Sequence, residues 1–299
     1  MKIKIETNKE RIDKFLANEL NLSRTEIQKK IKNGEIKVND NFVKNNFVVE
    51  PGMIIEIEDK QDKINDNKIS PEKMEIDIVY EDDYLAIINK PSNLVVHPAP
   101  GHYTKTLVNG LMYHFNNLSN INGELRPGIV HRIDKDTSGL LIITKDNKTH
   151  EKIAKMLEKK EIKREYIAIV HGEIEEEEAE IIAPIGRDSK DRKKMAVTSK
   201  NSKYAKTNFE VLKRYKNYSL IKCILETGRT HQIRVHLNYI NYPIVGDPVY
   251  GPKKTIDTKG QALHAYRIHF IHPITNKNID VEVDIPTEMK KTIDIIKGI

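Results

Sequence analysis

Apolar residues in the first sixty positions follow a pattern typical of two short helices and then strands. The first helix is indicated by apolar residues at helical spacing, Ile12, Phe15, Leu16 and Leu20. The second begins with a capping box, in which Ser23 and Glu26 each satisfy a free backbone N–H, and ends at Asn33-Gly34. Two strands with a polar turn after the first are then predicted, at residues 36–38 and 53–57, with the turn at 39–41.

From Met74 onward the pattern changes to longer apolar strands separated by helices. The predicted strands are 76–80, 85–88, 140–144, 166–170, 220–225, 266–271 and 279–283. The last two flank a polar turn at residues 275–278, which predicts a hairpin. Residues 59–73 are polar and are interpreted as a linker. We therefore expect an α+β protein with a small domain at 1–58, a linker at 59–73 and a large domain at 74–299.

Composition and charge narrow the class of protein. The chain has 299 residues, of which 38% are hydrophobic and 31% charged, as in a folded globular protein. No stretch approaches the roughly 18 apolar residues of a membrane helix, and the first residues, MKIKIETNKE, contain no apolar stretch of signal-peptide length, so we expect a cytoplasmic protein with no membrane partner. The net charge of +6 favours a polyanionic partner, although many soluble proteins are mildly basic. The single cysteine, Cys223, lies in an apolar run and is expected to be buried.

Basic residues cluster on the second predicted helix and just after it, at Arg24, Lys29, Lys30, Lys32 and Lys37. Such a cluster by itself is more often a solvated helix face. However, two short helices that lead into the strand NGEIKVND resemble the S4 RNA-binding domain, which implies that Arg24, Lys29, Lys30 and Lys37 contact structured RNA. The acidic run at 173–180 is interpreted as surface that faces away from RNA. The basic run at 187–194, with Arg187 and Arg192, is either a surface loop or a contact to the phosphate backbone.

One segment, GIVHRIDKDTSG at residues 128–139, precedes an apolar strand and contains the strongest candidate for chemistry. An Asp-rich turn in this position often serves turn geometry, with Asp136 or Thr137 as a cap. Asp134 has many apolar neighbours in sequence, and burial disfavours a charged carboxylate, so an ionised Asp134 needs a cation nearby. The segment TGRTHQIRVH at 227–236 can supply one.

The same segment predicts a helix with Thr230 as its N-cap and with Ile233, Leu237 and Ile240 on its buried face; it ends before Pro243. Histidines at 131, 231 and 236 also suggest a metal site, but His231 and His236 are five residues apart, which does not place two ligands on one helix face. Structural or RNA-contacting histidines, and no metal, are expected.

Four motifs in order resemble the RluA family of pseudouridine synthases over about residues 74–290. They are KP with VVHP and TLVN (Lys90 to Asn109), HRIDKDTSGLL (131–141), REY (164–166), and GRTHQIRVHL (228–237) followed by YPIVGD (242–247). Only Ile133, where the family usually has leucine, departs from the pattern, and this substitution is conservative. The resemblance implies a mixed, largely antiparallel central sheet with flanking helices.

The resemblance also implies roles. Asp134 matches the family's catalytic aspartate, Arg234 the arginine that pairs with it, and Tyr166 the tyrosine that packs on the target base. Arg132 matches an arginine that occupies the space left by a flipped uridine. Converting uridine to pseudouridine gains and loses no atoms, so no cofactor is implied, and the sequence has no phosphate-binding loop of the GxxxxGK[ST] type.

The expected substrate is RNA. The chain resembles the synthases of the large ribosomal subunit most closely, which implies uridines of 23S ribosomal RNA as the target, with transfer RNA as the alternative. Two rival functions remain open from the sequence. One is an RNA-binding module with an inactive catalytic fold, which the intact Asp134, Tyr166 and Arg234 disfavour. The other is an aminoacyl-tRNA synthetase with an S4 domain, which requires ATP-binding motifs that we do not find. We expect a monomer.

Overall fold

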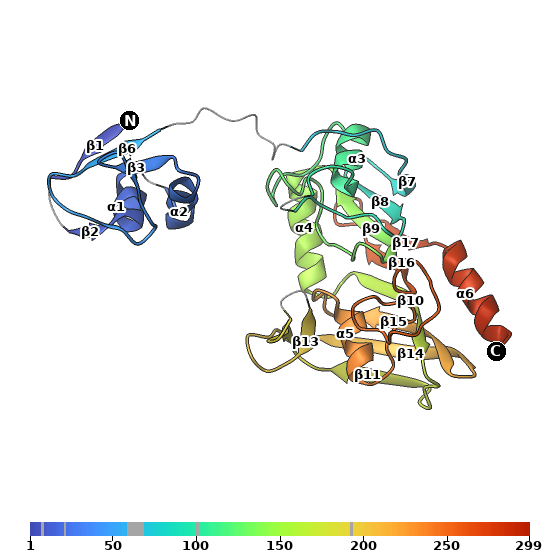
Figure 1. Cartoon of the computed structure of the whole chain (residues 1–299). Helices are drawn as coiled ribbons and strands as arrows, with labels where there is room; N and C mark the ends of the chain where they lie inside the picture. Colours follow the sequence, from blue (N-terminus) through green and yellow to red (C-terminus); the bar gives the residue numbers. More distant parts are fainter. Residues whose placement is uncertain (7–8, 21, 59–68, 100–101, 192–193) are drawn as a thin grey trace. The chain divides into compact units, whose positions relative to one another are not determined.

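The structure is a computed structural model that describes residues 1–6, 9–20, 22–58, 69–99, 102–191 and 194–299. Within the chain, Met1–Asn67 and Lys68–Ile299 form two compact units (Figure 1). Among the described residues, no helix combines the length and the apolar character needed to cross a membrane.

The first unit places two helices against a small antiparallel sheet. Its elements are β1 Lys2–Lys4, β2 Glu10–Arg11, α1 Ile12–Glu19, α2 Arg24–Lys32, β3 Ile36–Val38, β4 Asn41–Phe42, β5 Val48–Val49 and β6 Ile54–Ile57. Four strands pair in the order β1-β6-β3-β4, while β2 pairs with β5. The helices bury Ile12, Leu16 and Ile27 against Ile36 and Ile55 of the sheet. Both predicted helices and both predicted strands are therefore present.

A helix cap and a turn in this unit agree with the predictions from the sequence. Ser23 is the N-cap of α2, its hydroxyl accepts from the Glu26 N–H at 3.3 Å, and the Glu26 carboxylate accepts from the Ser23 N–H at 2.8 Å. The capping box is thus confirmed. Asn39 and Asp40 have φ of 44° and 63°, as the two central residues of a type I′ turn require, and they join the paired strands β3 and β4.

The second unit contains the remaining helices and strands of the described chain. They are β7 Asp77–Glu81, β8 Leu85–Lys90, α3 Leu107–His114, β9 Ser138–Thr144, α4 Asn147–Glu158, β10 Lys163–His171, β11 Glu178–Ile182, β12 Ile185–Arg187, β13 Met195–Val197, β14 Lys206–Tyr215, β15 Tyr218–Leu225, α5 Gln232–Tyr239, β16 Leu263–Ile271, β17 Asn278–Glu282 and α6 Thr287–Lys297. Every strand predicted from Met74 onward is present with slightly different bounds, and β16 and β17 form the predicted hairpin.

A nine-stranded sheet forms the centre of this unit, in the order β11-β14-β15-β10-β16-β9-β8-β7, with β17 also paired to β16. The pairing of β16 with β9 is parallel, and the other pairs in this sheet are antiparallel. Alternate residues of β8 and β9 face opposite sides: Ile88 and Leu141 pack with α3, whereas Ile87 and Ile142 lie in the cluster that contains Ile153 of α4. The expected α+β class, with a mixed and largely antiparallel sheet and flanking helices, is confirmed.

The parallel pairing between β9 and β16 depends on Gly139. This glycine has a φ of 108°, and a Cβ built on it would lie 2.2 Å from the carbonyl oxygen of Ala265. We expect Gly139→Ala to destabilise the second unit by about 3 kcal/mol, because both the φ and the backbone contact oppose a side chain. Urea denaturation followed by circular dichroism would measure this loss. Gly123→Ala is a matched control, since Gly123 also has a positive φ but has nothing within 4 Å of a built Cβ; equal losses in the two variants would contradict the close contact.

Two further predictions fall on features outside the sheet core. Most of the predicted linker, residues 59–68, lies outside the described residues. The rest of it belongs to the second unit and packs within it: Ile69 lies in the cluster around α3, and the Glu72 N–H donates to the carbonyl of Asn109. The glutamates of the acidic run, Glu173, Glu175 to Glu178 and Glu180, are exposed as predicted, but the run also contains the start of the edge strand β11, which we did not predict.

Candidate active site

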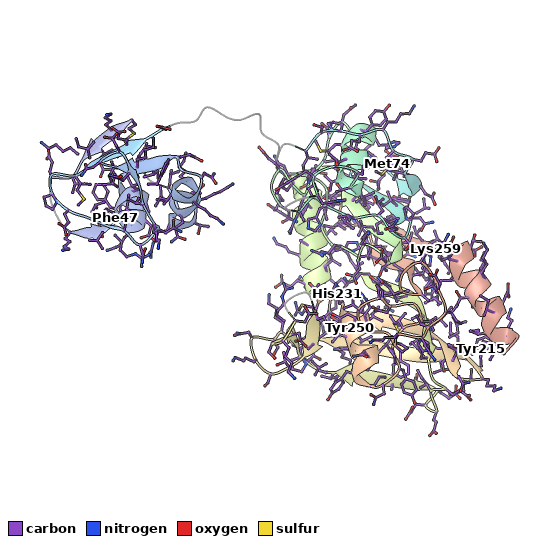
Figure 2. All side chains as sticks on the ribbon, viewed as in Figure 1. Phe47, Met74, Tyr215, His231, Tyr250 and Lys259 are labelled. Atoms are coloured by element: carbon purple, nitrogen blue, oxygen red, sulfur yellow. The ribbon has the colours of Figure 1, made fainter. Side chains whose placement is uncertain are left out.

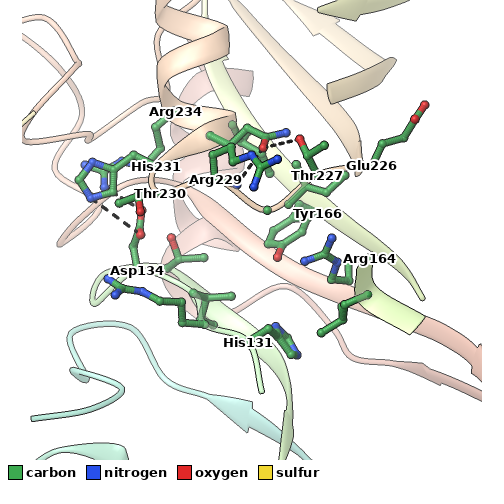
Figure 3. A pocket seen from close by; sticks show the side chains of 18 of the residues that line it. His131, Asp134, Arg164, Tyr166, Glu226, Thr227, Arg229, Thr230, His231 and Arg234 are labelled. Carbon is green, nitrogen blue, oxygen red and sulfur yellow. Dashed lines mark hydrogen bonds and ion pairs between the residues drawn. The ribbon is translucent and has the colours of Figure 1, made fainter. Parts of the chain in front are cut away.

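A pocket of about 680 Å³ lies within the second unit, beside the middle of the nine-stranded sheet (Figure 3). It is lined by three stretches far apart in the sequence: the loop before β9, the start of β10, and the segment that joins β15 to α5. These stretches contain the HRIDKDTSGLL, REY and GRTHQIRVHL motifs. Three of the four motifs recognised in the sequence thus contribute to one pocket.

Asp134 lies on the loop before β9, and several backbone contacts fix this loop. The fully buried Lys90 ammonium donates to the carbonyls of Pro91, Leu94 and Lys135 at 2.7 to 3.0 Å. The Ser92 hydroxyl donates to the carbonyl of Asp136 at 2.9 Å. Lys90 belongs to the KP motif, so the fourth motif holds the loop in place through these hydrogen bonds. The Asp134 side chain itself is 17% exposed and reaches the pocket.

Arg234 joins Asp134 to a second carboxylate. Its Nη1 donates to Asp134 Oδ2 at 2.8 Å, while its Nε and Nη2 donate to the two oxygens of Asp247 at 2.7 and 2.9 Å. The expected cation beside Asp134 is therefore present, 100 positions away in the sequence. Burial lowers the pKa of Arg234, but Asp247 and Asp134 outweigh this effect and raise the pKa above its ordinary value.

Asp247 anchors this arrangement, and we did not predict a role for it from the sequence. Its side chain is 0% exposed, and Oδ1 also accepts from the N–H groups of Val249 and Tyr250. Burial tends to raise the pKa of Asp247, yet Arg234 and these N–H groups reverse the effect and hold the pKa below its ordinary value. The signal was available, because Asp247 ends the YPIVGD motif. An ionised Asp247 thus fixes the direction of the Arg234 guanidinium.

Tyr166 projects from β10 into the pocket near Arg164 (Figure 3). Burial raises the pKa of the Tyr166 phenol, which keeps it neutral at ordinary pH. Arg164 is 8% exposed, and its Nε has no hydrogen-bond partner among the described residues. The backbone of Gly228 lies close to this guanidinium, since a Cβ built there would be 3.0 Å from Nη1. The pocket therefore combines an aromatic ring with hydrogen-bond donors.

The prediction that Thr230 caps α5 is wrong. The N-cap is His231, which has a left-handed backbone with φ of 58°, and the helix begins at Gln232. The reason lies in the turn before the helix: the Gln232 side-chain carbonyl accepts from both the Thr227 hydroxyl and the Arg229 N–H. The Gln232 side chain therefore makes the hydrogen bonds at the start of the helix that were expected of Thr230. Ile233 and Leu237 are buried as predicted, and Ile240 is half-buried.

His231 is aimed at Asp134. Its Nε2 lies 3.9 Å from Asp134 Oδ1 (Figure 3). Its Nδ1 lies 2.9 Å from the hydroxyl of Tyr250, and Figure 2 labels both of these residues. Burial lowers the pKa of His231, and the charge of Asp134 opposes this shift. The Tyr250 ring also lies against the guanidinium of Arg234, with 5.1 Å between the Arg234 Cζ and the ring centroid. His231 and Arg234, the two side chains beside Asp134, therefore both contact Tyr250.

The other two histidines have local partners. His236 Nδ1 lies 3.0 Å from the Thr207 hydroxyl, and its Nε2 lies 2.9 Å from the carbonyl of Ala183. His131 Nε2 accepts from the N–H of Ile142 at 3.0 Å. Within the described ranges, no group of three or more His, Cys, Asp or Glu side chains is arranged to hold a metal ion. Cys223 is buried as predicted, and burial raises the pKa of its thiol to about 12.

The predicted RNA-contacting residues of the first unit differ in their surroundings. Arg24 donates to the buried carboxylate of Asp13 at 2.9 Å, although half of its side chain is exposed. Lys30 pairs with Glu35 at 3.0 Å. Lys37 pairs with Glu58 at 3.1 Å and lies over the ring of Phe42. Lys29 is exposed on α2.

In the second unit, Arg132 is exposed on the loop before Asp134 and lines the pocket. Arg187 is an exposed residue of the short strand β12. Arg192 lies outside the described residues. The structure thus brings Asp134, Tyr166, Arg234 and Arg132 to one pocket, and it leaves Arg187 beyond the lining of that pocket.

The sequence pattern of the RNA pseudouridylate synthase family matches residues 84–239, and that of the S4 domain matches residues 10–55. The chain is 50% identical over 293 residues to the uncharacterized RNA pseudouridine synthase YlyB of Bacillus subtilis (strain 168), covering 98% of this chain and 96% of the relative. It is 45% identical to the ribosomal large subunit pseudouridine synthase D of Zymomonas mobilis, covering 74% of this chain and 72% of the relative.

Solved structures agree on the fold. The human RNA pseudouridylate synthase domain containing 1 protein superposes with a TM-score of 0.58 at 21% identity, covering 75% of this chain and 96% of that one. The sequence matches also decide against the aminoacyl-tRNA synthetase alternative. The chain belongs to the RNA pseudouridylate synthase family and is an RNA pseudouridine synthase with an S4 domain.

Proposed function

We propose that this enzyme isomerises specific uridines of 23S ribosomal RNA, with Asp134 as the catalytic carboxylate. The observation that carries the catalytic part is the ion pair in which Arg234 holds Asp134 at 2.8 Å in a pocket that also contains Tyr166. The ribosomal substrate is supported by relatives in Zymomonas mobilis and in Neisseria meningitidis serogroup B, both named as ribosomal large subunit pseudouridine synthase D, at 45% and 39% identity.

The reaction breaks the bond from C1′ to N1 of uridine, turns the uracil and joins C5 to C1′, and the proton lost from C5 is balanced by one gained at N1. Stacked RNA hides these atoms, so the target base must leave the helix and enter the pocket, at a cost of a few kcal/mol. Arg132, exposed two residues before Asp134, is proposed to occupy the space that the base leaves. The pocket's volume of about 680 Å³ is large enough for a nucleoside.

Asp134 is proposed to act on the sugar, either by attacking C1′ or by taking the proton from C2′ while the uracil departs. Both routes need an ionised carboxylate. Arg234 pairs with Oδ2 of Asp134 and leaves Oδ1 without a hydrogen-bond donor among the described residues. The reacting oxygen is therefore Oδ1. Tyr166 is proposed to pack on the uracil, a contact worth about 1–3 kcal/mol, which offsets part of the cost of flipping.

The S4 unit and the surface arginines are proposed to hold the RNA through its phosphates. Lys29, Lys30 and Lys37 lie on or just after α2, and Arg24 begins that helix. Arg187 on β12 is proposed to add a phosphate contact, and so is Arg192, which lies outside the described residues. Such contacts position the RNA without reading its sequence. They also predict that affinity falls as salt rises, because bound counterions are released from the phosphates.

The test is to incubate the purified enzyme with unmodified 23S ribosomal RNA, and separately with transfer RNA, without added cofactor. Carbodiimide labelling and primer extension then map each pseudouridine. We expect stops at one or a few uridines of 23S ribosomal RNA and none in transfer RNA. Stops in transfer RNA alone would contradict the ribosomal substrate, and the absence of stops in both RNAs and in nascent ribosomal particles would support the inactive-module alternative.

A further inference from the structure

The two oxygens of Asp134 have different surroundings. Oδ2 accepts from Arg234 at 2.8 Å, whereas Oδ1 faces the His231 Nε2 across a gap of 3.9 Å. That gap is too long for a direct hydrogen bond. Both atoms border the same pocket, since Asp134 and His231 each line it. Figure 3 shows His231 and Arg234 on the same side of Asp134. His231 has therefore been brought to the reacting oxygen without being bonded to it.

The contacts of the two His231 nitrogens indicate which of them carries the proton. The Met195 N–H donates to the Tyr250 hydroxyl oxygen at 2.9 Å, and His231 Nδ1 lies 2.9 Å from the same oxygen. Because a hydroxyl oxygen has two lone pairs, Nδ1 can either accept the hydroxyl proton or donate to this oxygen. The Asp134 carboxylate, 3.9 Å from Nε2, favours the first arrangement, since a neutral imidazole that accepts at Nδ1 turns an N–H on Nε2 toward that carboxylate. His231 thus presents an N–H, not a lone pair, toward Asp134.

The backbone of His231 supports this orientation. Its φ of 58° is in the left-handed region, which a residue other than glycine rarely adopts. This conformation places His231 at the N-cap of α5, three residues before Arg234 on the same helix. The ring is further held edge-on against Tyr250, with 5.7 Å between centroids. The donor is consequently rigid before any substrate arrives.

An N–H and a carboxylate oxygen 3.9 Å apart can both bind one hydroxyl group. A hydroxyl oxygen placed about 2.8 Å from each atom subtends an angle of about 90° between them, which suits an oxygen that accepts one hydrogen bond and donates another. The hydroxyl would accept from His231 and donate to Asp134. Asp134 offers only an acceptor and His231 only a donor, so the hydroxyl group needs both side chains to form its two hydrogen bonds.

The uridine supplies a hydroxyl at the right place. If Asp134 acts at C1′ or C2′, as proposed above, the ribose 2′-hydroxyl is the hydroxyl nearest to its carboxylate, because it is bonded to C2′ itself. We propose that His231, together with Asp134, binds the 2′-hydroxyl of the target uridine and thereby makes the site selective for ribose over deoxyribose. This inference rests on the proposed function, and it assigns to His231 a specificity-determining role.

Two substitutions separate this role from a structural one. In His231→Gln the side-chain amide can place an N–H where Nε2 was, so the donor toward Asp134 is kept. In His231→Asn the shorter amide reaches only the position of Nδ1, so the contact with Tyr250 is kept and the donor toward Asp134 is lost. A residue needed only to support Tyr250 would tolerate asparagine better than glutamine.

The measurement uses the full-length enzyme and a stem-loop containing a uridine that the wild type modifies. The stem-loop is made with ribose or with 2′-deoxyribose at that single position, and dissociation constants are obtained by fluorescence anisotropy. We expect the wild type to bind the ribose form about tenfold more tightly, which corresponds to the loss of one hydrogen bond to a charged group. His231→Gln should keep most of this ratio, whereas His231→Asn should reduce it severalfold, because the hydroxyl then keeps only its hydrogen bond to Asp134.

Any other order of the two variants, or a wild-type ratio near 1, overturns the inference. Thermal unfolding checks that both variants fold. If His231→Asn does not fold, Tyr250→Phe takes its place, since it removes the hydroxyl that holds His231 Nδ1 and so keeps Nε2 turned toward Asp134; an unchanged ratio in that variant would overturn the inference. A wild type that forms no pseudouridine in any RNA instead refutes the proposed function, so the two failures are distinguishable.

Discussion

Asp134→Asn is expected to lower kcat for pseudouridine formation by about 10⁴-fold or more, the scale seen when a residue that performs the chemistry is removed. Asparagine has nearly the same shape as aspartate. Its amide neither attacks C1′ nor takes a proton from C2′ at ordinary pH. The comparison is made by tritium release from C5-labelled RNA under single-turnover conditions, so that product release does not mask the chemical step.

The same variant should fold and bind RNA normally. Arg234 keeps its two bonds to Asp247 when Asp134 loses its charge, and the Asp134 side chain is partly exposed, so little buried charge is left unpaired. Asp136→Asn is a matched control, because Asp136 lies on the same loop and its carboxylate is not among the groups lining the pocket. Turnover by Asp134→Asn within tenfold of the wild type would show that another residue carries the reaction.

Arg234→Met should cost about 4 kcal/mol of stability as well as most of the activity. The reason is Asp247, whose fully buried carboxylate would lose the one arginine or lysine that pairs with it among the described residues, and breaking a buried ion pair on one side is strongly destabilising. Urea denaturation monitored by circular dichroism would measure the loss. The double variant Arg234→Met with Asp247→Asn should recover part of the stability, since it removes the unpaired charge, but none of the activity.

The pH dependence of Arg234→Met should also differ from that of the wild type. In the wild type the pKa of Asp247 lies below its ordinary value of 3.8, so the stabilisation is present above pH 3.8 and is lost as the pH falls below it. In the variant burial is no longer opposed by Arg234, which raises the pKa of Asp247, so protonation should instead stabilise the variant as the pH falls. Identical pH profiles of stability would contradict an ionised Asp247.

Local patterns predicted much of the fold. The capping box at Ser23, the turn at Asn39 and Asp40 and the apolar strands could be read from a few adjacent residues, because they depend on local backbone chemistry. The strand β14 was missed although Thr207, Phe209 and Val211 alternate as buried residues, since charged residues lie between and after them. Strand β11 was hidden in a run of glutamates, because an edge strand can be charged on its exposed side.

The site could be predicted only in part. Asp134, Tyr166 and Arg234 were identified through resemblance, since no spacing rule relates residues 100 positions apart. Asp247 could have been proposed from its place at the end of the YPIVGD motif, but its pairing with Arg234, and the contact of Tyr250 with His231, exist only in the folded chain. The left-handed backbone of His231 was also unpredictable, because the side chain of Gln232 closes the turn in place of Thr230.

The way in which β9 joins β16 has a consequence for the precision of the site. The strands β7 to β9, whose preceding loop carries Asp134, pair with the part of the sheet that carries Tyr166 at Ser138 with His264 and at Gly139 with Ala265. Buried apolar side chains such as Ile142 and Phe270 pack beside this junction, and the Ser138 hydroxyl lies 2.8 Å from His264 Nδ1. The spacing between Asp134 and Tyr166 therefore depends on a short stretch of backbone at which the two halves of the sheet meet, so substitutions there should affect catalysis without touching the substrate.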